Sequence, residues 1–510
     1  MPPEDLINPF IVNCQGGLIL DTGVLAMPPG ACSELQNYEP DINGGYRRLD
    51  GYSKYSATEL SGAGNVLGVA ILGSNVIGAR GANLQKGTGT TWTSIVTNRT
   101  SAGRYHFRKY NWTGSETLLG ADGVNYPFTY DNSTYTLLNG AVGSGFGTAP
   151  IAPDVVVEHK GRTVSGGYTN LGGSGAILIT PQFTPNEFRA SEGALEIKLG
   201  DTFVNAISFR EELYIFCERR IYKLVGSSPS DFQVKPVANS IGCIASHSVQ
   251  ELAGDIIYLA PDGLRTVSGT AKIGDVALDN ISKGIQPRLR NLTTAQISSV
   301  TVDSKTQYRL FFPTTAVDTA NAKGVVGTLR RNTETGQPGW EWADLKGINP
   351  NVCWSDRIGD DEYILHGANG SGFVFRQDNG NTFNGTNIVA KFRSPDYNMG
   401  DPGLRKILQR INLNYEADGA INVQLYARLN YEDININQPG AKNITQGSNS
   451  AVYGTAQYGT GIYGLSNVPL KRQHLEGSGF AIAVEINDTS SNPSHTIRGF
   501  SIESVPGGRR

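Results

Sequence analysis

The fold is decided by the stretch Phe203-Val-Asn-Ala-Ile-Ser-Phe209, Arg210-Glu-Glu212, Leu213-Tyr-Ile-Phe-Cys217. Short apolar runs alternate here with charged residues, a pattern typical of β-strands joined by tight turns. Arg219-Arg220 then turns the chain into a third run, Ile221-Tyr-Lys-Leu-Val225. The stretch leaves no room for a helix and predicts a three-stranded meander.

The same meander recurs along the chain from residue 63 to residue 390. Successive copies start about 40 to 55 residues apart, which is the repeat length of four-stranded propeller blades. The sequence therefore predicts an all-β fold, with a β-propeller of six or seven blades over residues 63–390. A helix over about residues 280–291 is expected as an insertion between blades. The copies open near Val66, Arg104, Val155, Phe203, Asp255, Ser298 and Glu362.

The segments on either side of the propeller differ from it in pattern. Residues 391–510 contain strands with clean alternation, such as Ile421-Asn-Val-Gln-Leu-Tyr-Ala427, which predicts a half-buried antiparallel sheet and a C-terminal β-sandwich domain. Residues 1–62 are irregular and are expected to form an extended N-terminal docking segment. Within them, Arg47 and Arg48 are adjacent and cannot share one face of a strand, so at least one is expected to face a partner or a carboxylate.

Composition supports this fold class and excludes several functions. The chain has 510 residues with 63 Gly, and only 17% of its residues are charged, which suits many turns between many strands. With a formal net charge of −3, no global basic field indicates tight nucleic-acid binding. The N-terminus lacks the pattern of a secretory signal, and no apolar run is long enough to predict a membrane span. The five Cys are scattered and are expected to be buried free thiols.

Motifs of common enzymes and cofactor sites find little support. The six His are far apart, so the sequence does not predict a zinc site. The Gly-x-Gly-x-x-Gly at Gly459–Gly464 is followed by Leu-Ser-Asn-Val-Pro rather than a helix, so we reject a dinucleotide site there. We expect no cofactor and no catalytic residue. The same loop carries Tyr453, Tyr458 and Tyr463 at a spacing of five, and it is either a contact loop for a neighbouring subunit or partner, or an ordinary surface loop.

An acidic cluster is the one candidate for catalysis or ion binding. Asp356, Asp360, Asp361 and Glu362 lie close together in the sequence. Such a group can bind calcium or supply paired carboxylates for sugar hydrolysis. A simply solvated turn is the more common arrangement, so the cluster alone does not predict an enzyme.

Segments at both ends of the chain resemble a known family. They are similar to the tail nozzle proteins of short-tailed bacteriophages, also called tail hub or packaged-DNA stabilisation proteins, in which comparable Gly-Gly, asparagine and Arg-Arg segments precede a β-propeller. The segments are Asn13-Cys-Gln-Gly-Gly17 with Pro28-Pro-Gly-Ala-Cys-Ser-Glu-Leu-Gln-Asn37, Gly45-Tyr-Arg-Arg-Leu-Asp-Gly51, and Ile497-Arg-Gly-Phe-Ser-Ile-Glu503 with Gly507-Gly-Arg-Arg510.

The resemblance implies a structural virion protein that is made in the host cytoplasm and assembles into the phage tail. It implies a homohexameric ring below the portal and its adaptor, which retains packaged double-stranded DNA, conducts it during ejection without sequence-specific binding, and carries tailspikes or fibres. A weakly acidic chain is compatible with this, because a dense basic lining would bind phosphates and stall the DNA. On this reading Arg47, Arg48, Arg509 and Arg510 are candidates for docking to the adaptor, and the tyrosine loop is the candidate subunit contact.

Two other functions remain open from the sequence. A propeller that binds or depolymerises carbohydrate at the host surface would use the acids at 356–362, with Trp340, Trp342 and Trp354 as stacking platforms. A non-viral adhesion module built from a propeller and a sandwich is the third possibility. Loss of sugar cleavage on substitution of Asp360 or Asp361 would favour the enzyme.

Overall fold

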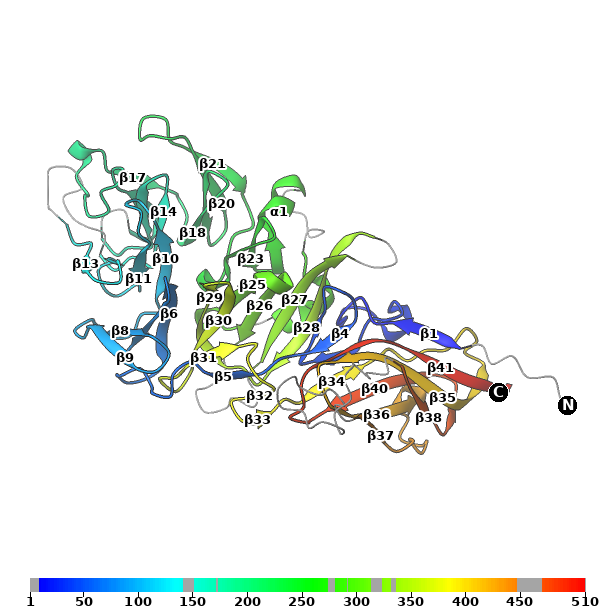
Figure 1. The fold of residues 1–510 in the computed structure, drawn as a ribbon. Coiled ribbons are helices and arrows are strands. Elements are labelled where there is room, and N and C mark those ends of the chain that lie inside the picture. Colours follow the sequence, from blue (N-terminus) through cyan, green and yellow to red (C-terminus); the bar gives the residue numbers. More distant parts are fainter. Residues whose placement is uncertain are drawn as a thin grey trace.

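The computed structural model describes residues 9–140, 151–170, 173–273, 280–290, 292–312, 323–331, 336–446 and 470–509. They form an all-β molecule with two parts, a β-propeller and a C-terminal β-sandwich (Figure 1). The fold class predicted from the sequence is confirmed. Within the described residues, no helix is long and apolar enough to cross a membrane.

The stretch that decides the fold forms one complete blade. Its four antiparallel strands are β18 (Phe203–Phe209), β19 (Glu212–Cys217), β20 (Ile221–Val225) and β21 (Gln233–Ala238). Arg210 and Glu211 have φ of 49° and 65°, so both central residues of the first turn are left-handed. Such two-residue turns match the twist of the flanking strands. The predicted three-stranded meander is therefore confirmed and gains a fourth, outer strand.

Similar sheets follow one another around the ring. Of the propeller sheets among the described residues, four have four strands and one, β22–β24, has three. The other two blades, which begin with β25 and β29, belong to larger sheets of nine and six strands. The sheets that precede β18 are β6 (Val66–Leu72), β7 (Asn75–Arg80), β8 (Asn83–Gly87) and β9 (Trp92–Val96); β10 (His106–Tyr110), β11 (Thr117–Ala121), β12 (Phe128–Tyr130) and β13 (Tyr135–Leu137); and β14 (Val155–His159), β15 (Arg162–Gly166), β16 (Ala176–Ile179) and β17 (Leu195–Lys198).

The remaining propeller sheets lead towards the sandwich. They are β22 (Gln250–Leu252), β23 (Asp255–Ala260) and β24 (Gly263–Thr266); β25 (Ser298–Val302), β26 (Gln307–Phe312), β27 (Lys323–Arg331) and β28 (Pro338–Lys346); and β29 (Pro350–Ile358), β30 (Asp361–Ala368) and β31 (Val374–Gln377). The last sheet takes its fourth strand from the N-terminal segment, because β5 (Tyr52–Lys54) pairs with β31. This exchange closes the ring with strands from both ends of the propeller.

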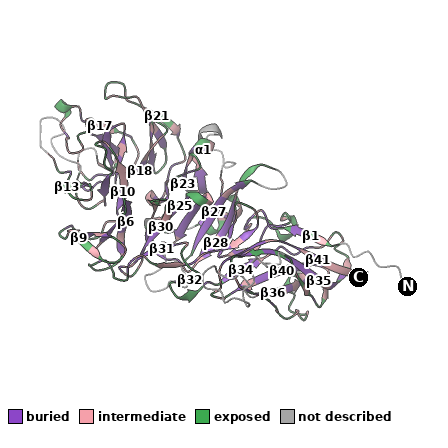
Figure 2. Cartoon of the chain, viewed as in Figure 1, coloured by how far each residue is buried: buried purple, intermediate pink, exposed green. Residues whose placement is uncertain are grey.

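Apolar clusters between neighbouring sheets hold the ring together. One cluster joins the β6–β9 and β10–β13 sheets, others join each following pair, and a cluster of Val66, Val352, Leu365 and Val374 joins the last sheet to the first. Buried positions accordingly run along the strands of the ring, as Figure 2 shows. Each blade is stabilised by its two neighbours, as expected for stacked repeats.

The sandwich consists of two sheets around one apolar core. One sheet contains β1 (Phe10–Asn13), β3 (Tyr38–Pro40), β4 (Tyr46–Arg48), β35 (Leu404–Ala417), β38 (Leu470–His474), β39 (Ser478–Gly479) and β41 (His495–Arg509), and the other contains β34 (Ala390–Arg393), β36 (Ile421–Leu429), β37 (Lys442–Gln446) and β40 (Ile482–Asp488). In β36, Ile421, Val423 and Leu425 are buried, whereas Asn422 and Gln424 are exposed, which confirms the predicted alternation.

The N-terminal segment is not the separate, irregular segment that the sequence suggested, because its strands belong to both parts of the fold; a docking role for it stays a prediction. β1, β3 and β4 belong to the sandwich, β5 belongs to the propeller, and β2 (Glu34–Gln36) bridges the two by pairing with β28 and with β34. A nine-stranded sheet consequently runs from β25 in the propeller to β37 in the sandwich. Pairing with distant strands satisfies the backbone of this segment, and sequence pattern alone does not reveal such pairing.

Helices are short in this fold. α1 (Val267–Ile273) follows β24 and was not expected. The helix expected over 280–291 is shorter than predicted, because α2 covers only Gln286–Leu289 and follows a turn of 3-10 helix at Lys283–Ile285. The strands β32 (Thr382–Phe383) and β33 (Thr386–Asn387) complete the edge of the last propeller sheet. The five Cys are free, and four of them are buried, as expected; Cys353 is half-buried.

Candidate functional site

The segments that carry the family resemblance meet at the junction of the propeller and the sandwich. The amide of Cys14 donates to the carbonyl of Arg498 at 3.0 Å, and the amide of Gln15 donates to the carbonyl of Gly30 at 3.2 Å. From the neighbouring turn, the amide of Leu18 donates to the carbonyl of Trp342 at 2.7 Å. Residues from both ends of the chain and from β28 are therefore joined at one place by backbone hydrogen bonds.

Three glycines make this approach possible because a side chain would collide with backbone. A Cβ on Gly30, which has φ +90°, would lie 2.0 Å from the carbonyl oxygen of Asn13, and one on Gly17 would lie 2.7 Å from the amide nitrogen of Trp342. A Cβ on Gly51 would lie 2.2 Å from the carbonyl oxygen of Thr382. Contacts this short require glycine, so these positions explain the Gly-rich segments structurally.

Tyr46 lies at the centre of the junction. It is fully buried, its hydroxyl donates to the carbonyl of Gly30 at 2.7 Å, and it accepts from the amide of Gly17 at 3.0 Å. Burial raises the pKa of its phenol, so the hydroxyl keeps the proton that it donates. The Arg330 guanidinium lies over its ring, 5.7 Å from the centroid. The tyrosine thereby ties the two glycine turns together.

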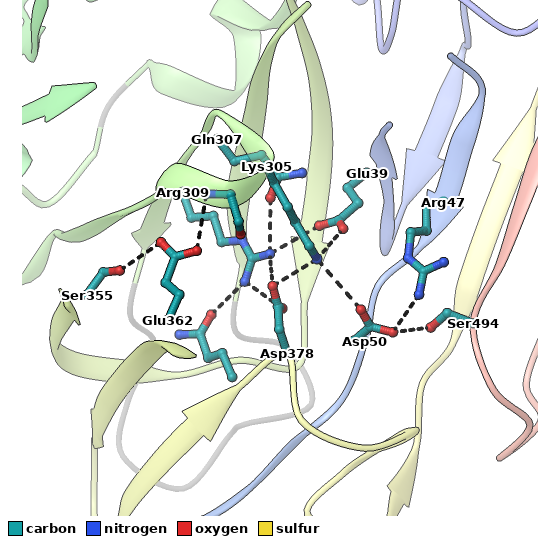
Figure 3. A network of polar contacts seen from close by, with 12 residues as sticks. Glu39, Arg47, Asp50, Lys305, Gln307, Arg309, Ser355, Glu362, Asp378 and Ser494 are labelled. Carbon is teal, nitrogen blue, oxygen red and sulfur yellow. Dashed lines mark hydrogen bonds and ion pairs between the residues drawn. The ribbon is translucent and has the colours of Figure 1, made fainter. Parts of the chain in front are cut away.

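A buried charge network lies beside the junction (Figure 3). Arg309 on β26 is fully buried and donates to both carboxylate oxygens of Asp378, at 2.9 and 2.8 Å, and it forms an ion pair with Glu39 at 3.2 Å. Lys305 forms further ion pairs with Glu39 at 2.7 Å and Asp378 at 2.8 Å. Bidentate pairing suits the planar guanidinium. The four side chains come from the N-terminal segment, from two propeller sheets and from the turn between β25 and β26.

The network continues into the sandwich through Asp50. This carboxylate accepts from the hydroxyl of Ser494 at 2.6 Å and forms ion pairs with Arg47 at 3.2 Å and Lys305 at 3.6 Å. Arg47 also contacts Asp418 at 2.6 Å. Charged contacts therefore link the propeller directly to the sandwich.

Charged neighbours within the network shift the pKa values of Asp378 and Lys305. Burial works to raise the pKa of the Asp378 carboxyl, but Arg309 and Lys305 outweigh it and hold that pKa well below its ordinary value. Burial likewise works to lower the pKa of Lys305, and the charges of Asp378 and Glu39 raise it above the ordinary value instead. Asp378 and Lys305 are therefore both charged at neutral pH. Removal of one member of the cluster would leave a buried charge uncompensated.

The predicted docking residues have different environments. Arg48 is fully buried, forms an ion pair with Asp488 at 3.0 Å and donates to the carbonyls of Ser490 and Asn492 at 2.8 Å. It is thus unavailable for docking, because its guanidinium is enclosed by its own chain. The expectation that at least one of the two arginines faces a partner or a carboxylate is met by carboxylates, since Arg47 pairs with Asp50 and Asp418, and Arg48 pairs with Asp488.

The other predicted positions are exposed or lie outside the described residues. The side chain of Arg509 is 77% exposed and forms an ion pair with Asp401 at 2.9 Å. Arg510 and the tyrosine loop with Tyr453, Tyr458 and Tyr463 lie outside the described residues, so their proposed contacts stay predictions.

Two of the four acids in the cluster, Glu362 and Asp356, have structural partners, whereas Asp360 and Asp361 are exposed. Glu362 accepts from the backbone amides of Asp303 and Ser304, at 2.7 and 3.2 Å, and Asp356 pairs with Lys109 at 2.6 Å. Glu362 therefore caps the short 3-10 turn η8 (Asp303–Lys305), which carries the lysine of the buried network. Among the described residues, no group of three or more His, Cys, Asp or Glu is placed to hold a metal ion.

The tryptophans proposed as sugar platforms do not form one surface. Trp342 is 3% exposed and donates its indole N–H to the carbonyl of Ile281 at 2.8 Å, while Trp340 stacks on it with ring centroids 5.6 Å apart. Trp354 lies elsewhere, at the centre of the propeller. Two of the three rings thus pack together near the junction.

Sequence reasoning missed the residues that hold the junction together. Glu39, Asp378 and the neighbouring pair Lys305 and Arg309 belong to three segments that are far apart along the chain, so no spacing brings them together. The one available signal was the charge of Arg309 within the apolar run Gln307-Tyr-Arg-Leu-Phe-Phe312. A charge in a buried strand requires a partner.

Comparisons with known proteins identify no family. No protein-family model and no curated protein matches the chain. Similar solved structures include BBS1N in complex with ARL6DN, with 13% identity and a TM-score of 0.39, where the match covers 68% of this chain and 99% of that one. An ancestral GH74 enzyme matches with 9% identity and a TM-score of 0.39, covering 68% of this chain and 51% of that one. Hsv2 of Kluyveromyces lactis matches with 9% identity and a TM-score of 0.29, covering 56% of this chain and all of that one. Similarities this low carry no argument about function.

Proposed function

We propose that this protein is a structural component of a short-tailed phage virion, a tail nozzle or hub whose copies form a ring below the portal and adaptor. In this role the ring retains packaged DNA, conducts it during ejection and carries spikes or fibres. The proposal rests on the resemblance of the terminal segments. The observation that supports it most is the junction, where those same segments bind the propeller to the sandwich.

The junction suits a part that bears load. A nine-stranded sheet crosses from the propeller to the sandwich, and the network of Glu39, Lys305, Arg309 and Asp378 locks the same boundary. Separate domains joined by a linker move relative to one another by default. A shared sheet and buried ion pairs oppose that motion, as a ring under the pressure of packaged DNA requires.

The centre of the propeller itself is too narrow to conduct DNA. His106 on β10 stacks on His247 of η4 (Ser246–Ser248), with ring centroids 3.8 Å apart. Two other sheets separate these elements around the ring, so side chains meet across its middle. The major groove alone of a DNA duplex is about 12 Å wide. A conduit built from this protein would therefore form between copies, which supports the proposed ring.

The proposed function predicts a ring with an open centre. Negative-stain imaging of the purified protein, alone and mixed with virions that lack the tail, is expected to show six-fold rings or six-fold density added at the portal vertex. The expected cause is lateral contact between copies, including the tyrosine loop, whose deletion over 453–464 should weaken the ring. A stable monomer that ignores the virions would overturn the proposal.

Charge reversal at the exposed tail is expected to weaken docking. Arg509→Glu should lower the occupancy of the portal vertex about tenfold, because it places a carboxylate beside Asp401 and reverses the charge offered to the adaptor. Quantitative imaging of reconstituted particles measures the occupancy. Arg219→Glu, at another exposed arginine in the propeller, is the matched control and should leave the occupancy unchanged. Equal occupancy for both variants would contradict a docking role for the tail.

The carbohydrate function has less support. Glu362 and Asp356 are engaged in structural contacts, and Trp342 is buried. Assays on host polysaccharide remain the test of this alternative, and they follow if the protein forms no ring.

A further inference from the structure

A cavity of about 150 Å³ lies at the centre of the propeller. Its walls come from β6, β10, β18, β22, β25 and β29, which are the first strands of six sheets. The stacked pair His106 and His247 is part of this wall. The cavity therefore occupies the position around which all the sheets are arranged.

The wall of the cavity is electrically unbalanced. Among the described residues that line it, Arg108 carries the one formal charge and none is acidic. Burial lowers the pKa of the Arg108 guanidinium to about 10, so it stays protonated at neutral pH. Burial lowers the pKa of His106 and His247, and nearby arginines lower it further, so both rings are neutral. The wall of the cavity thus carries one half-buried positive charge and no carboxylate.

Two hydrogen-bond donors in the wall lack an acceptor. Arg108 donates from Nη1 to the carbonyl of Phe107 at 3.1 Å, but within the part of the chain that the structure describes no acceptor is available to its buried Nε or to the buried indole Nε1 of Trp354. Buried donors are normally paired, and each unpaired one is costly. Both residues line the cavity, so an acceptor bound there is the candidate partner of each.

A second, more open hollow lies next to the cavity and is lined by residues of some of the same strands. This hollow, of about 380 Å³, shares Arg108 and Gln250 with the cavity. Its other lining residues include Lys109 and Ser208, and also the carboxylates of Glu158 and Glu251. Lys109 follows Arg108 on β10, and Ser208 lies three residues beyond Asn205 on β18. Arg108 thereby stands between the cavity and a more open hollow next to it.

We propose that the centre of the propeller is a binding site for a small oxyanion, with Arg108 as the counter-charge and the Trp354 N–H as a second donor. The chemical class is phosphate or carboxylate, either as a free ion or as a group of a larger molecule that enters past Arg108. The volume equals the share of about five water molecules in the liquid, which suits such a group. The proposal does not depend on the ring function.

Titration with inorganic phosphate and, separately, with acetate tests this site. Calorimetry at constant ionic strength is expected to show saturable binding of at least one anion to the wild-type protein, and which anion binds distinguishes the two chemistries. Arg108→Met should weaken that binding at least tenfold, because the counter-charge is lost. Trp354→Phe keeps an aromatic side chain at this position but removes the indole N–H donor. This variant should weaken anion binding severalfold.

The control is Arg219→Met, which removes an exposed arginine from the same propeller and should bind like the wild type. Thermal unfolding establishes that each variant is folded, and Trp354→Phe keeps the test decisive if Arg108→Met does not fold. The proposal is overturned if neither anion binds at millimolar concentration, or if binding is equal in the wild type and both cavity variants.

Discussion

Arg309→Met is expected to lower the free energy of unfolding by about 3–5 kcal/mol, the usual effect of breaking a buried ion pair from one side. The substitution removes the bidentate contact with Asp378 and the ion pair with Glu39. Both carboxylates are then left to share Lys305 in a site from which water is largely excluded. Urea denaturation followed by tryptophan fluorescence measures the loss.

Two variants separate the causes of this effect. Arg309→Lys keeps the charge but not the planar fork, and should lose an intermediate amount. Arg410→Met is the matched control, because Arg410 is 48% exposed and lies 4.0 Å from Glu503; exposed pairs of this kind contribute at most about 1 kcal/mol. An Arg309→Met protein as stable as this control would show that the network does not hold the junction.

The fold was largely predictable because strand patterns are local. The run Phe203–Val225 contains its own strands and turns, so one blade could be identified and its repeats recognised. The alternation of apolar and polar residues in Ile421–Ala427 likewise predicted a strand with one buried face, as the structure shows. Local pattern does not say which strands pair across hundreds of residues, and for this reason the N-terminal segment was misassigned although it supplies strands to both parts.

The candidate site was less predictable for the same reason. Arg48 was expected to dock a partner. Alternate residues of a strand point to opposite faces, and the side chain of Arg48 points to the face where it pairs with Asp488, near the other end of the chain. The cavity beside Arg108 is lined by strands of six sheets, so the pattern of no single segment predicts it. The glycines were identified only as part of the family resemblance. The structure explains them, because a Cβ at each position would lie too close to a backbone atom of another segment.

Gly30→Ala is expected to destabilise the protein by about 2–5 kcal/mol, through two separate terms. The left-handed backbone costs an alanine about 1–2 kcal/mol, and the collision of its Cβ with the carbonyl of Asn13 adds the 1–3 kcal/mol that is typical of overpacking. This carbonyl cannot move easily, because Asn13 pairs with Gly499 in the sandwich sheet and Gly30 is bound by Gln15 and Tyr46. Chemical denaturation gives the total.

Comparison with Gly44→Ala isolates the free-energy cost of the Cβ collision, because Gly44→Ala has only the cost of the left-handed backbone. Gly44 has φ +94°, close to the +90° of Gly30, but no atom lies within 4 Å of the position its Cβ would take. The difference between the two variants therefore measures the close approach alone, and it should be about 1–3 kcal/mol. If the two variants are equally stable, the glycine at position 30 serves only the turn, and the β1 strand is free to shift. If Gly30→Ala is less stable than Gly44→Ala by the expected amount, the contact between the N-terminal segment and the sandwich is a rigid part of the junction, as the proposed function would require.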